Sequence, residues 1–235
     1  MRNYIAVVPA RSGSKGVADK NIQSFRGQPL LVHSLRHGKE AKFVNEVFLW
    51  TDSAQYLDIA KQHVDIPDIR LRTAFIDDFA TDYQFLNDLL QELKFLAIAV
   101  DAIVLLRPTT PVREATLIDS CVAKFEEVWD FYDSLRTVCV ADKTPFKMWF
   151  ADQGPQNSLV GRPLSNLLGG IVDSHSLPRQ ALPLVYTQNG AVDIIKVETI
   201  VKKGSSAGDR ICLYTMDEDM IDIDSASDIE KWDTK

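Results

Sequence analysis

The sequence predicts an α/β fold in which helices cover both faces of a mostly parallel sheet. Its strand-like segments are rich in Val, Ile and Leu with little alternation, as expected for strands buried on both faces. Segments with helical periodicity lie between them, and this alternation is typical of parallel sheets. We therefore expect a Rossmann-like three-layer sandwich. The strand-like segments are residues 4–8, 46–50, 101–106, 135–141, 191–196 and 211–215.

Three segments between these strands have the apolar spacing of amphipathic helices. Residues 114–130 give the clearest pattern, and residues 81–96 and 29–41 follow, the last opening on Pro29, which suits a first helical turn. The stripe in the first of them consists of Leu117, Ile118, Cys121, Val122, Phe125, Val128 and Trp129.

The loop after the first strand carries the residues of an anion site. Residues 11–16 read Arg-Ser-Gly-Ser-Lys-Gly, which supplies two cations, two hydroxyls and two glycines. Small residues let successive backbone N–H groups point at one spot, and Arg11 and Lys15 are suited to gripping phosphate. The spacing matches neither the Walker A loop nor the dinucleotide pattern. It indicates a nucleoside triphosphate site, with an ordinary Gly/Ser turn as the alternative.

Asp222 and Asp224 lie two residues apart in a segment that alternates with isoleucine. On an extended backbone both carboxylates face the same way. Mg²⁺ prefers such hard oxygen ligands together with phosphate oxygens and water. The pair therefore predicts a metal site that meets the basic loop at one edge of the sheet. The alternative is a solvated acidic strand end, because other acidic residues lie nearby in the sequence.

The composition excludes several classes of function. The 235 residues suffice for a single domain spanning 1–235, and a net charge of −7 argues against binding nucleic acid or an anionic membrane. The sequence contains neither an apolar stretch of transmembrane length nor the pattern of a signal peptide. Cys121, Cys139 and Cys212 are far apart in apolar contexts, which indicates reduced, buried thiols in a cytoplasmic protein.

Residues 142–188 differ from the rest in composition. They hold five of the ten prolines and several glycines, without strong periodicity. A stretch of this length inside a compact domain is usually functional or contacts a partner. We therefore expect a segment that is functional or contacts a partner, with a long surface excursion of one subunit as the alternative.

Five segments, in order, resemble the acylneuraminate cytidylyltransferases, also called CMP-sialic acid synthetases. Together they extend across nearly the whole chain, and each alone is a modest match. They are residues 5–16 followed by Lys20-Asn21, then 50–53, 105–113, 178–183 running on to 189–191, and 221–224.

The resemblance implies a fold of the nucleotide-diphospho-sugar transferase type and an Mg²⁺-dependent nucleotidyl transfer. CMP would pass from CTP to the anomeric hydroxyl of an acidic 2-keto-3-deoxy sugar, sialic acid or a related nonulosonate, with release of pyrophosphate. Residues 142–188 would form an arm that closes the sugar site across a homodimer. By the same resemblance, Arg11, Ser14 and Lys15 would hold the triphosphate, and Lys20 and Asn21 would also bind the nucleotide. Arg72 and Thr81 would bind the cytosine, and Asp222 and Asp224 would hold the metal. The catalytic group would consist of Arg11, Lys15 and the two aspartates.

The sugar side departs from the familiar sialic-acid enzymes. Arg107 stands where those enzymes carry glutamine, and Asp193 where they carry tyrosine. Asn189, Lys147 and Arg179 match the family, and the last two would suit a sugar carboxylate. Buried polar groups discriminate strongly between substrates, so these five residues predict an acidic nonulosonate-like acceptor more securely than N-acetylneuraminic acid itself.

Two other classes of protein share parts of this pattern. A nucleotide-sugar-dependent glycosyltransferase also uses an Asp-x-Asp metal site, but there the motif typically ends a strand in the middle of the chain, and the basic loop would be unexplained. A non-catalytic nucleotide-binding homologue would keep the fold, but the presence of both aspartates and the loop cations argues against this class. A cytidylyltransferase would release pyrophosphate from CTP only when a sugar acid is present. This requirement distinguishes it from the other two classes.

Overall fold

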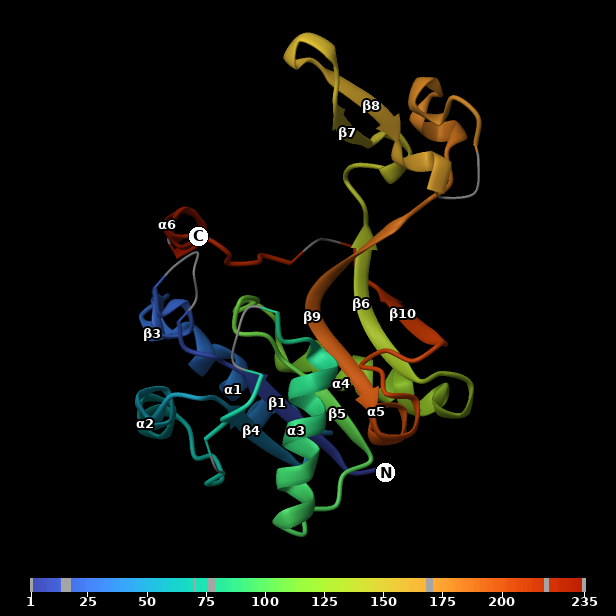
Figure 1. The fold of residues 1–235 in the computed structure, drawn as a ribbon. Coiled ribbons are helices and arrows are strands. Elements are labelled where there is room, and N and C mark those ends of the chain that lie inside the picture. The colour runs from blue at the N-terminus through green and yellow to red at the C-terminus, as the bar shows by residue number, and fades with distance from the viewer. Residues whose placement is uncertain are drawn as a thin grey trace.

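The computed structural model describes residues 2–13, 18–69, 71–75, 79–167, 171–217 and 220–233. Its centre is a six-stranded sheet in the order β10-β6-β9-β5-β1-β4 (Figure 1). β9 runs antiparallel to both of its neighbours, and the other neighbouring strands are parallel. The predicted mostly parallel sheet is therefore confirmed. The strands are β1 (Tyr4–Pro9), β4 (Glu46–Trp50), β5 (Ala102–Leu105), β6 (Ser134–Val140), β9 (Tyr186–Lys196) and β10 (Ile211–Thr215).

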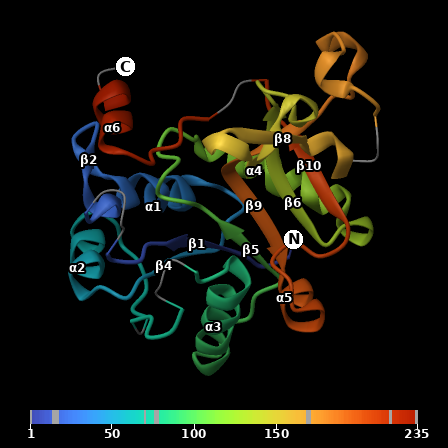
Figure 2. The same ribbon diagram turned by 45° about the horizontal axis from the view of Figure 1, so that its top comes forward.

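Helices cover both faces of this sheet, as predicted. On one face pack α1 (Leu30–Glu40), α2 (Ala54–His63) and α4 (Ala115–Glu127), and on the other α3 (Asp82–Phe95) and α5 (Val197–Lys203) (Figure 2). Alternate residues of β1 belong to different cores: Tyr4, Ala6 and Val8 face the first set of helices, and Ile5 and Val7 face the second. Burial on both faces explains why the strand sequences do not alternate.

A third, smaller apolar cluster fixes the end of the chain. Its buried members are Phe25 and Leu30, next to the short strands β2 (Ser24–Phe25) and β3 (Gln28–Pro29), and Ile223. The side chains of α6 (Ala226–Asp233) pack against it through Ile229 and Trp232. The segment that carries the two predicted metal ligands is thus held against the start of the chain.

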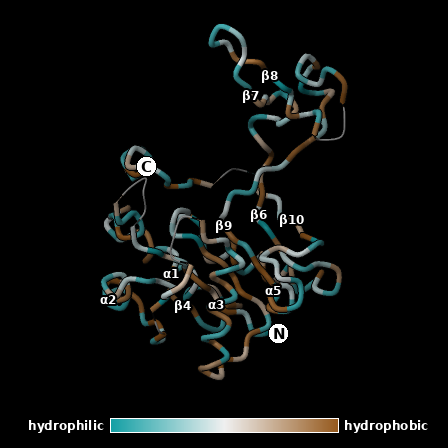
Figure 3. Tube along the Cα trace, viewed as in Figure 1, coloured by the Kyte–Doolittle hydropathy of each residue, from teal (hydrophilic) through white to brown (hydrophobic). Residues whose placement is uncertain are grey.

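An arm leaves the body where β6 and β9 extend beyond the rest of the sheet (Figure 1). It contains the antiparallel hairpin β7 (Trp149–Gln153) and β8 (Leu159–Pro163), and hydrophobic residues occur along it as well as in the body (Figure 3). Short 3₁₀ turns complete it: η3 (Pro145–Lys147), η4 (Pro155–Asn157), η5 (Leu164–Leu167), η6 (Ser174–Ser176) and η7 (Arg179–Ala181). Residues 142–167 and 171–188 lie in this protrusion, and its role as a dimerisation arm stays a prediction.

Two further expectations concern the chain as a whole. Cys121, Cys139 and Cys212 are buried and unbridged, as their apolar contexts predict. In the part of the chain that the structure describes, no helix is both long enough and apolar enough to span a bilayer.

Helix α3 begins with a capping box. The Thr81 hydroxyl accepts a hydrogen bond from the Gln84 backbone N–H at 3.3 Å, and Gln84 Oε1 accepts one from the Thr81 backbone N–H at 2.9 Å. Such a cap satisfies N–H groups that have no partner within the helix.

We expect Thr81→Ala to lower the free energy of unfolding by about 1 kcal/mol, because the substitution removes this cap. Thr81→Ser keeps the hydroxyl and serves as the control. Urea denaturation measures both, and equal stability of the alanine and serine variants would contradict the assigned cap.

Candidate functional site

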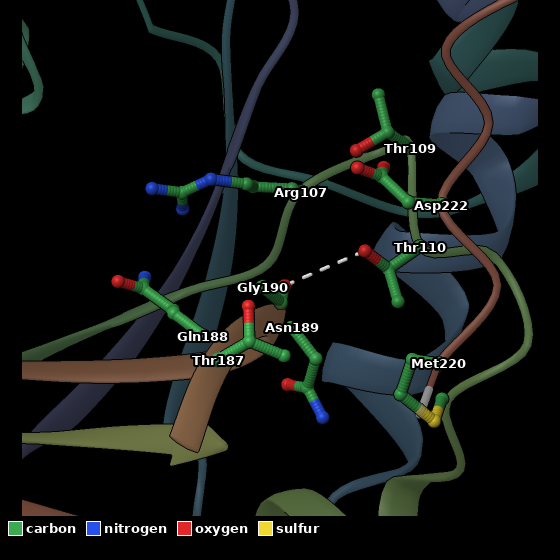
Figure 4. A pocket seen from close by; sticks show the side chains of 9 residues that line it. All are labelled: Arg107, Thr109, Thr110, Thr187, Gln188, Asn189, Gly190, Met220 and Asp222. Carbon is green, nitrogen blue, oxygen red and sulfur yellow. Dashed lines mark hydrogen bonds between the residues drawn. The ribbon is translucent and has the colours of Figure 1, made fainter. Parts of the chain in front are cut away.

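Two neighbouring cavities lie at the edge of the sheet where β1 and β5 end. The first, which we call the basic cavity, has a volume of about 260 Å³ and is bordered by Arg11, Lys20, Asn21, Arg72, Arg107 and Thr109, among others. The second, which we call the β9 cavity, has a volume of about 380 Å³ (Figure 4). Arg107 and Thr109 line both, so the two cavities meet at these side chains. The remaining walls of the β9 cavity are Thr110, Thr187, Gln188, Asn189, Gly190, Met220 and Asp222.

The basic cavity gathers most of the predicted nucleotide-binding residues. Arg11, Lys20, Asn21 and Arg72 come from separate segments and line the same cavity. Thr81 directly follows Ala80, which is also in the cavity wall. The other two predicted residues, Ser14 and Lys15, lie outside the described residues.

Hydrogen bonds hold the loop after β1 on both sides of residues 14–17, which lie outside the described residues. Ser12 donates to the Asp52 carboxylate from its backbone N–H and its hydroxyl, both at 2.7 Å. Asn21 donates from its side-chain amide to the Arg11 carbonyl at 3.0 Å, and the Tyr56 hydroxyl donates to Asp19 at 2.9 Å. Burial, together with this hydrogen bond, raises the pKa of Tyr56 well above its usual range. Asp52 and Tyr56 therefore shape the loop from the start of α2.

Arg72 is oriented by its surroundings. Its backbone N–H donates to the Thr51 carbonyl at 2.7 Å, and its Nε donates to the Ala74 carbonyl at 2.9 Å. The guanidinium carbon lies 5.3 Å from the centre of the Phe85 ring, within the range of a cation–π contact. The residue is almost fully buried, so its cation is fixed in the wall of the basic cavity.

The acidic pair near the end of the chain meets the basic cavity. Ile223 is buried in the third apolar cluster, and its backbone N–H donates to the Thr109 carbonyl at 2.7 Å. On either side of it, Asp222 lines the β9 cavity and Asp224 lies 3.0 Å from Lys20 Nζ. The predicted meeting of the basic start of the chain with its acidic end is thus observed at Lys20 and Asp224.

The two carboxylates form a donor set that suits a hard cation. Partial burial raises the pKa of Asp222 and the nearby Asp224 charge adds to this, whereas a hydrogen bond with Thr109 and the charges of Lys20 and Arg107 oppose it. Among the described residues, no group of three His, Cys, Asp or Glu side chains could hold a metal ion. A metal at this pair would therefore need further oxygen ligands from outside the described side chains, such as phosphate or water.

A bulge in β9 forms one wall of the β9 cavity. Asp193 pairs with Arg136 and Gln188 pairs with Val138, so β9 advances by five residues while β6 advances by two. Thr137 fills the gap, since its hydroxyl donates to the Val192 carbonyl at 3.1 Å and accepts from the Val192 N–H at 3.0 Å. Bulges of this kind redirect side chains near functional sites.

The bulge places two further residues in the cavity wall. Gly190 adopts a φ of +66°, in the left-handed region that favours glycine, and its carbonyl accepts a 3.5 Å hydrogen bond from Thr110 (Figure 4). Asn189, a predicted sugar-binding residue, lines the same wall, and its amide donates to Met216 Sδ at 3.2 Å. The turn at Gly190 thus places Asn189 beside it in the cavity wall.

Arg107 and Asp193, the two residues that depart from the family pattern, pair with each other. Arg107 Nη1 lies 3.0 Å from the Asp193 carboxylate, and its Nη2 lies 2.6 Å from Asp82. Asp193 is fully buried and is also bonded by Arg136 and by Gln188 Nε2, the latter at 3.2 Å. The Asp193 carboxylate is therefore surrounded by protein donors, and Arg107 is one of them.

The backbone of Arg107 is held as firmly as its side chain. Its carbonyl accepts hydrogen bonds from the Ser34 hydroxyl, at 3.0 Å, and from the Arg113 guanidinium. Arg113 is fully buried; burial lowers its pKa to about 9, and the nearby Arg107 charge acts in the same direction. Arg113, which has no predicted function, braces this loop through its bonds to the Arg107 carbonyl and the Ser34 hydroxyl.

The other two predicted sugar-binding residues lie in the arm. Lys147 is exposed at the end of η3. Arg179 lines a different cavity, at the base of the arm, and donates to the Asp142 carbonyl. Within one chain, the structure brings together Arg107, Asn189 and Asp193 but leaves Lys147 and Arg179 apart from them.

We expect Asp52→Ala to speed amide hydrogen exchange at Ser12 by at least about tenfold, because a hydrogen bond to a charged acceptor is lost. Asp58→Ala, at an exposed acid of α2, is the matched control and should leave this amide unchanged. Exchange followed by NMR measures the effect, and unaltered protection in the Asp52 variant would contradict the proposed pinning.

Known proteins resemble this chain in sequence and in fold. The N-acylneuraminate cytidylyltransferase of Streptococcus agalactiae serotype V is 27% identical over 230 residues, which cover 95% of this chain and 51% of that protein. The CMP-N,N'-diacetyllegionaminic acid synthase of Legionella pneumophila is 32% identical over 123 residues, or 50% and 51% of the two chains. The chain thus spans about half the length of these curated relatives.

Among solved structures, that of CMP:2-keto-3-deoxy-manno-octonic acid synthetase complexed with CTP superposes with a TM-score of 0.71. The match covers 99% of this chain and 97% of that one at 12% identity, so it shows a shared fold. A family model described as Cytidylyltransferase matches residues 5–140, which is more than half of the chain. The chain therefore belongs to the cytidylyltransferase family.

Proposed function

We propose that this protein transfers CMP from CTP to the anomeric hydroxyl of an acidic 2-keto-3-deoxy sugar, sialic acid or a related nonulosonate, and releases pyrophosphate. The observation that carries the proposal is the junction of a basic cavity with a second, polar cavity at Arg107 and Thr109. A donor nucleotide in one cavity and an acceptor in the other would meet there.

The basic cavity has the charge that a nucleoside triphosphate requires. Arg11, Lys20 and Arg72 all line it, in a protein whose overall charge is −7. Guanidinium groups bind phosphate through paired N–H donors, and lysine supplies a compact charge. We assign the phosphates to Arg11 and Lys20, together with Ser14 and Lys15, and the base to the wall formed by Arg72 and Ala80, next to Thr81.

The reaction joins the acceptor oxygen to the α-phosphorus. As this O–P bond forms, the bond from the α-phosphorus to the oxygen that bridges to the β-phosphate breaks, pyrophosphate leaves, and the hydroxyl proton is released. Such a displacement depends on an in-line arrangement and on charge stabilisation. Here Thr109 and Arg107 border the transfer point, and Asn189 and Gln188 line the acceptor side.

Asp222 and Asp224 are the residues that would hold Mg²⁺. The bound cation would supply positive charge to the phosphate oxygens during transfer. The two carboxylates fit this use, because both are hard oxygen donors, Asp222 lines the β9 cavity, and the Asp224 charge lies close enough to raise the pKa of Asp222. Lys20 Nζ forms an ion pair with Asp224 at 3.0 Å.

The experiment that tests the reaction measures pyrophosphate release from CTP with a panel of eight-carbon and nine-carbon keto sugar acids. Release should require both CTP and an acid. Turnover of a UDP-sugar with no acid-dependent release from CTP would contradict the proposal.

We expect Asp224→Ala to lower turnover by roughly a hundredfold or more, because the transition state loses charge stabilisation. The variant should also bind Mn²⁺ more weakly in a titration followed by electron paramagnetic resonance. Glu230→Ala, at an exposed acid of α6, is the control. Turnover near that of the wild type would remove Asp224 from the mechanism.

We also propose that the protein is a homodimer in which each arm covers the β9 cavity of the partner. Among the described residues that line this cavity, Arg107 is the one cation, and Asp82 and Asp193 balance its charge. An acidic acceptor would need a further cation, and Lys147 and Arg179 are carried on the arm. The arm also exposes large apolar side chains, as protein–protein interfaces do: Trp149, Phe150, Leu159, Val160, Leu167, Val172 and Leu184.

We expect the double variant Leu159→Asp, Leu167→Asp to shift the protein from dimer to monomer and to weaken acceptor binding, because charges would replace apolar side chains that are 72% and 73% exposed. Sedimentation equilibrium measures the first effect and the acceptor KM the second. Val201→Asp, at a similarly exposed apolar residue of α5, is the control. A monomeric wild-type protein would refute the dimer.

The proposed reaction is assigned to the cytoplasm. The three cysteines are buried and unbridged, which suits a reducing compartment.

A further inference from the structure

Arg107 is held from two sides at the point where the cavities meet. Its Nη1 bonds the Asp193 carboxylate at 3.0 Å and its Nη2 bonds Asp82 at 2.6 Å. A guanidinium carries five N–H donors in a rigid plane, and these contacts engage one terminal nitrogen each. The two carboxylates therefore fix the plane in which the remaining donors lie.

The two carboxylates differ in how firmly they are themselves held. Asp193 is fully buried and is also bonded by Arg136 and Gln188, so it is a rigid support within the sheet. Asp82 is one-third exposed, at 33% for its side chain, and is the first residue of α3. The contact between Asp82 and Arg107 can therefore form or break without leaving a buried carboxylate unpaired.

The same contacts determine the charge that an acceptor meets. Arg107 and Arg136 are balanced by Asp193 and Asp82 within one bonded group. Arg107 consequently presents oriented N–H donors to the β9 cavity with little net positive charge. Such a group suits the uncharged hydroxyl or carbonyl oxygens of a sugar better than a carboxylate, which an unpaired cation would bind more strongly.

Asp82 also connects this group to the nucleotide side. It follows Ala80 and the cap residue Thr81, and Ala80 lines the basic cavity. The first turn of α3 thus links a wall of the basic cavity to the orientation of Arg107. An acidic side chain is stabilised at this position by the N–H groups of the helix start.

We propose that Asp82 is a positioning residue for acceptor specificity: it holds Arg107 so that the guanidinium binds uncharged oxygens of the acceptor sugar. This inference rests on the proposed cytidylyl transfer and adds a residue and a selectivity to it. Asp82 itself lines neither of the two cavities.

The kinetic test compares Asp82→Asn with the wild-type protein in the pyrophosphate release assay. The KM for the acceptor should rise at least about tenfold, as for loss of a charge-assisted hydrogen bond, while the KM for CTP changes by less than about threefold. Asp82→Glu, which restores the charge, should recover part of the acceptor affinity. Asp58→Asn in α2 is the control. An unchanged acceptor KM, or an equal rise for both substrates, would overturn the proposal.

A double-mutant cycle shows whether the effect passes through Arg107. In an Arg107→Gln background, Asp82→Asn should raise the acceptor KM no further, because there is no guanidinium to position. An undiminished effect in that background would instead assign Asp82 a separate structural role and contradict the inference.

A spectroscopic test needs no turnover. In the wild-type protein, the terminal N–H groups of Arg107 should give separate NMR signals, since both carboxylates restrict rotation of the guanidinium. In Asp82→Asn these signals should broaden or merge, while the thermal midpoint shows that the fold persists. Unchanged signals would refute the positioning even in a folded variant. If the wild-type protein shows no acid-dependent release of pyrophosphate, the proposed function is refuted. The NMR comparison would still show whether Asp82 positions Arg107.

Discussion

The parallel alignment of β4, β1 and β5 is the constraint on which the site depends. Hydrogen bonds between these strands continue past their ends: the Ala10 N–H bonds the Trp50 carbonyl at 3.1 Å, and the Leu106 N–H bonds the Val7 carbonyl at 2.9 Å. The three loops that follow must therefore leave the sheet at the same edge, side by side. Arg11 and Arg107 gather in one cavity for this reason, and Arg72, which follows α2, reaches the same cavity because its N–H bonds the Thr51 carbonyl in the loop after β4.

Several charges at this edge are paired. Buried Asp193 receives two arginines, and Lys20 bonds Asp224. A buried ion that loses its partner is costly, so the pairing of Asp193 restrains the backbone segments that carry it and its arginines. The apolar cluster around Ile223 performs the complementary task, because it holds the acidic segment in place without using the carboxylates themselves.

Most of the fold could be predicted from the sequence, since a strand buried on both faces and an amphipathic helix each leave a local pattern. Helix α2 was missed, although Ser53, which caps it by accepting from the Tyr56 N–H at 3.3 Å, was a usable signal. The hairpin β7–β8 was missed because its residues are mostly exposed and leave no burial pattern. The antiparallel direction of β9 has no local signature, because that strand too is buried on both faces.

The site was predictable where a motif specifies chemistry, as at Arg11, Lys20, Asn21 and Asp222. It was not predictable where the function of a residue depends on a distant partner. The pairing of Arg107 with Asp193 joins residues 86 positions apart, and that of Ser12 with Asp52 joins residues 40 apart. The metal and the dimer remain predictions.

One consequence of β9 concerns the site and the arm together. This single strand carries Tyr186 at the root of the arm, then Gln188 and Asn189 at the cavity, then Asp193 beneath Arg107. Shifting the register of one part displaces the others, so the proposed acceptor wall and the proposed arm contact are coupled through this strand.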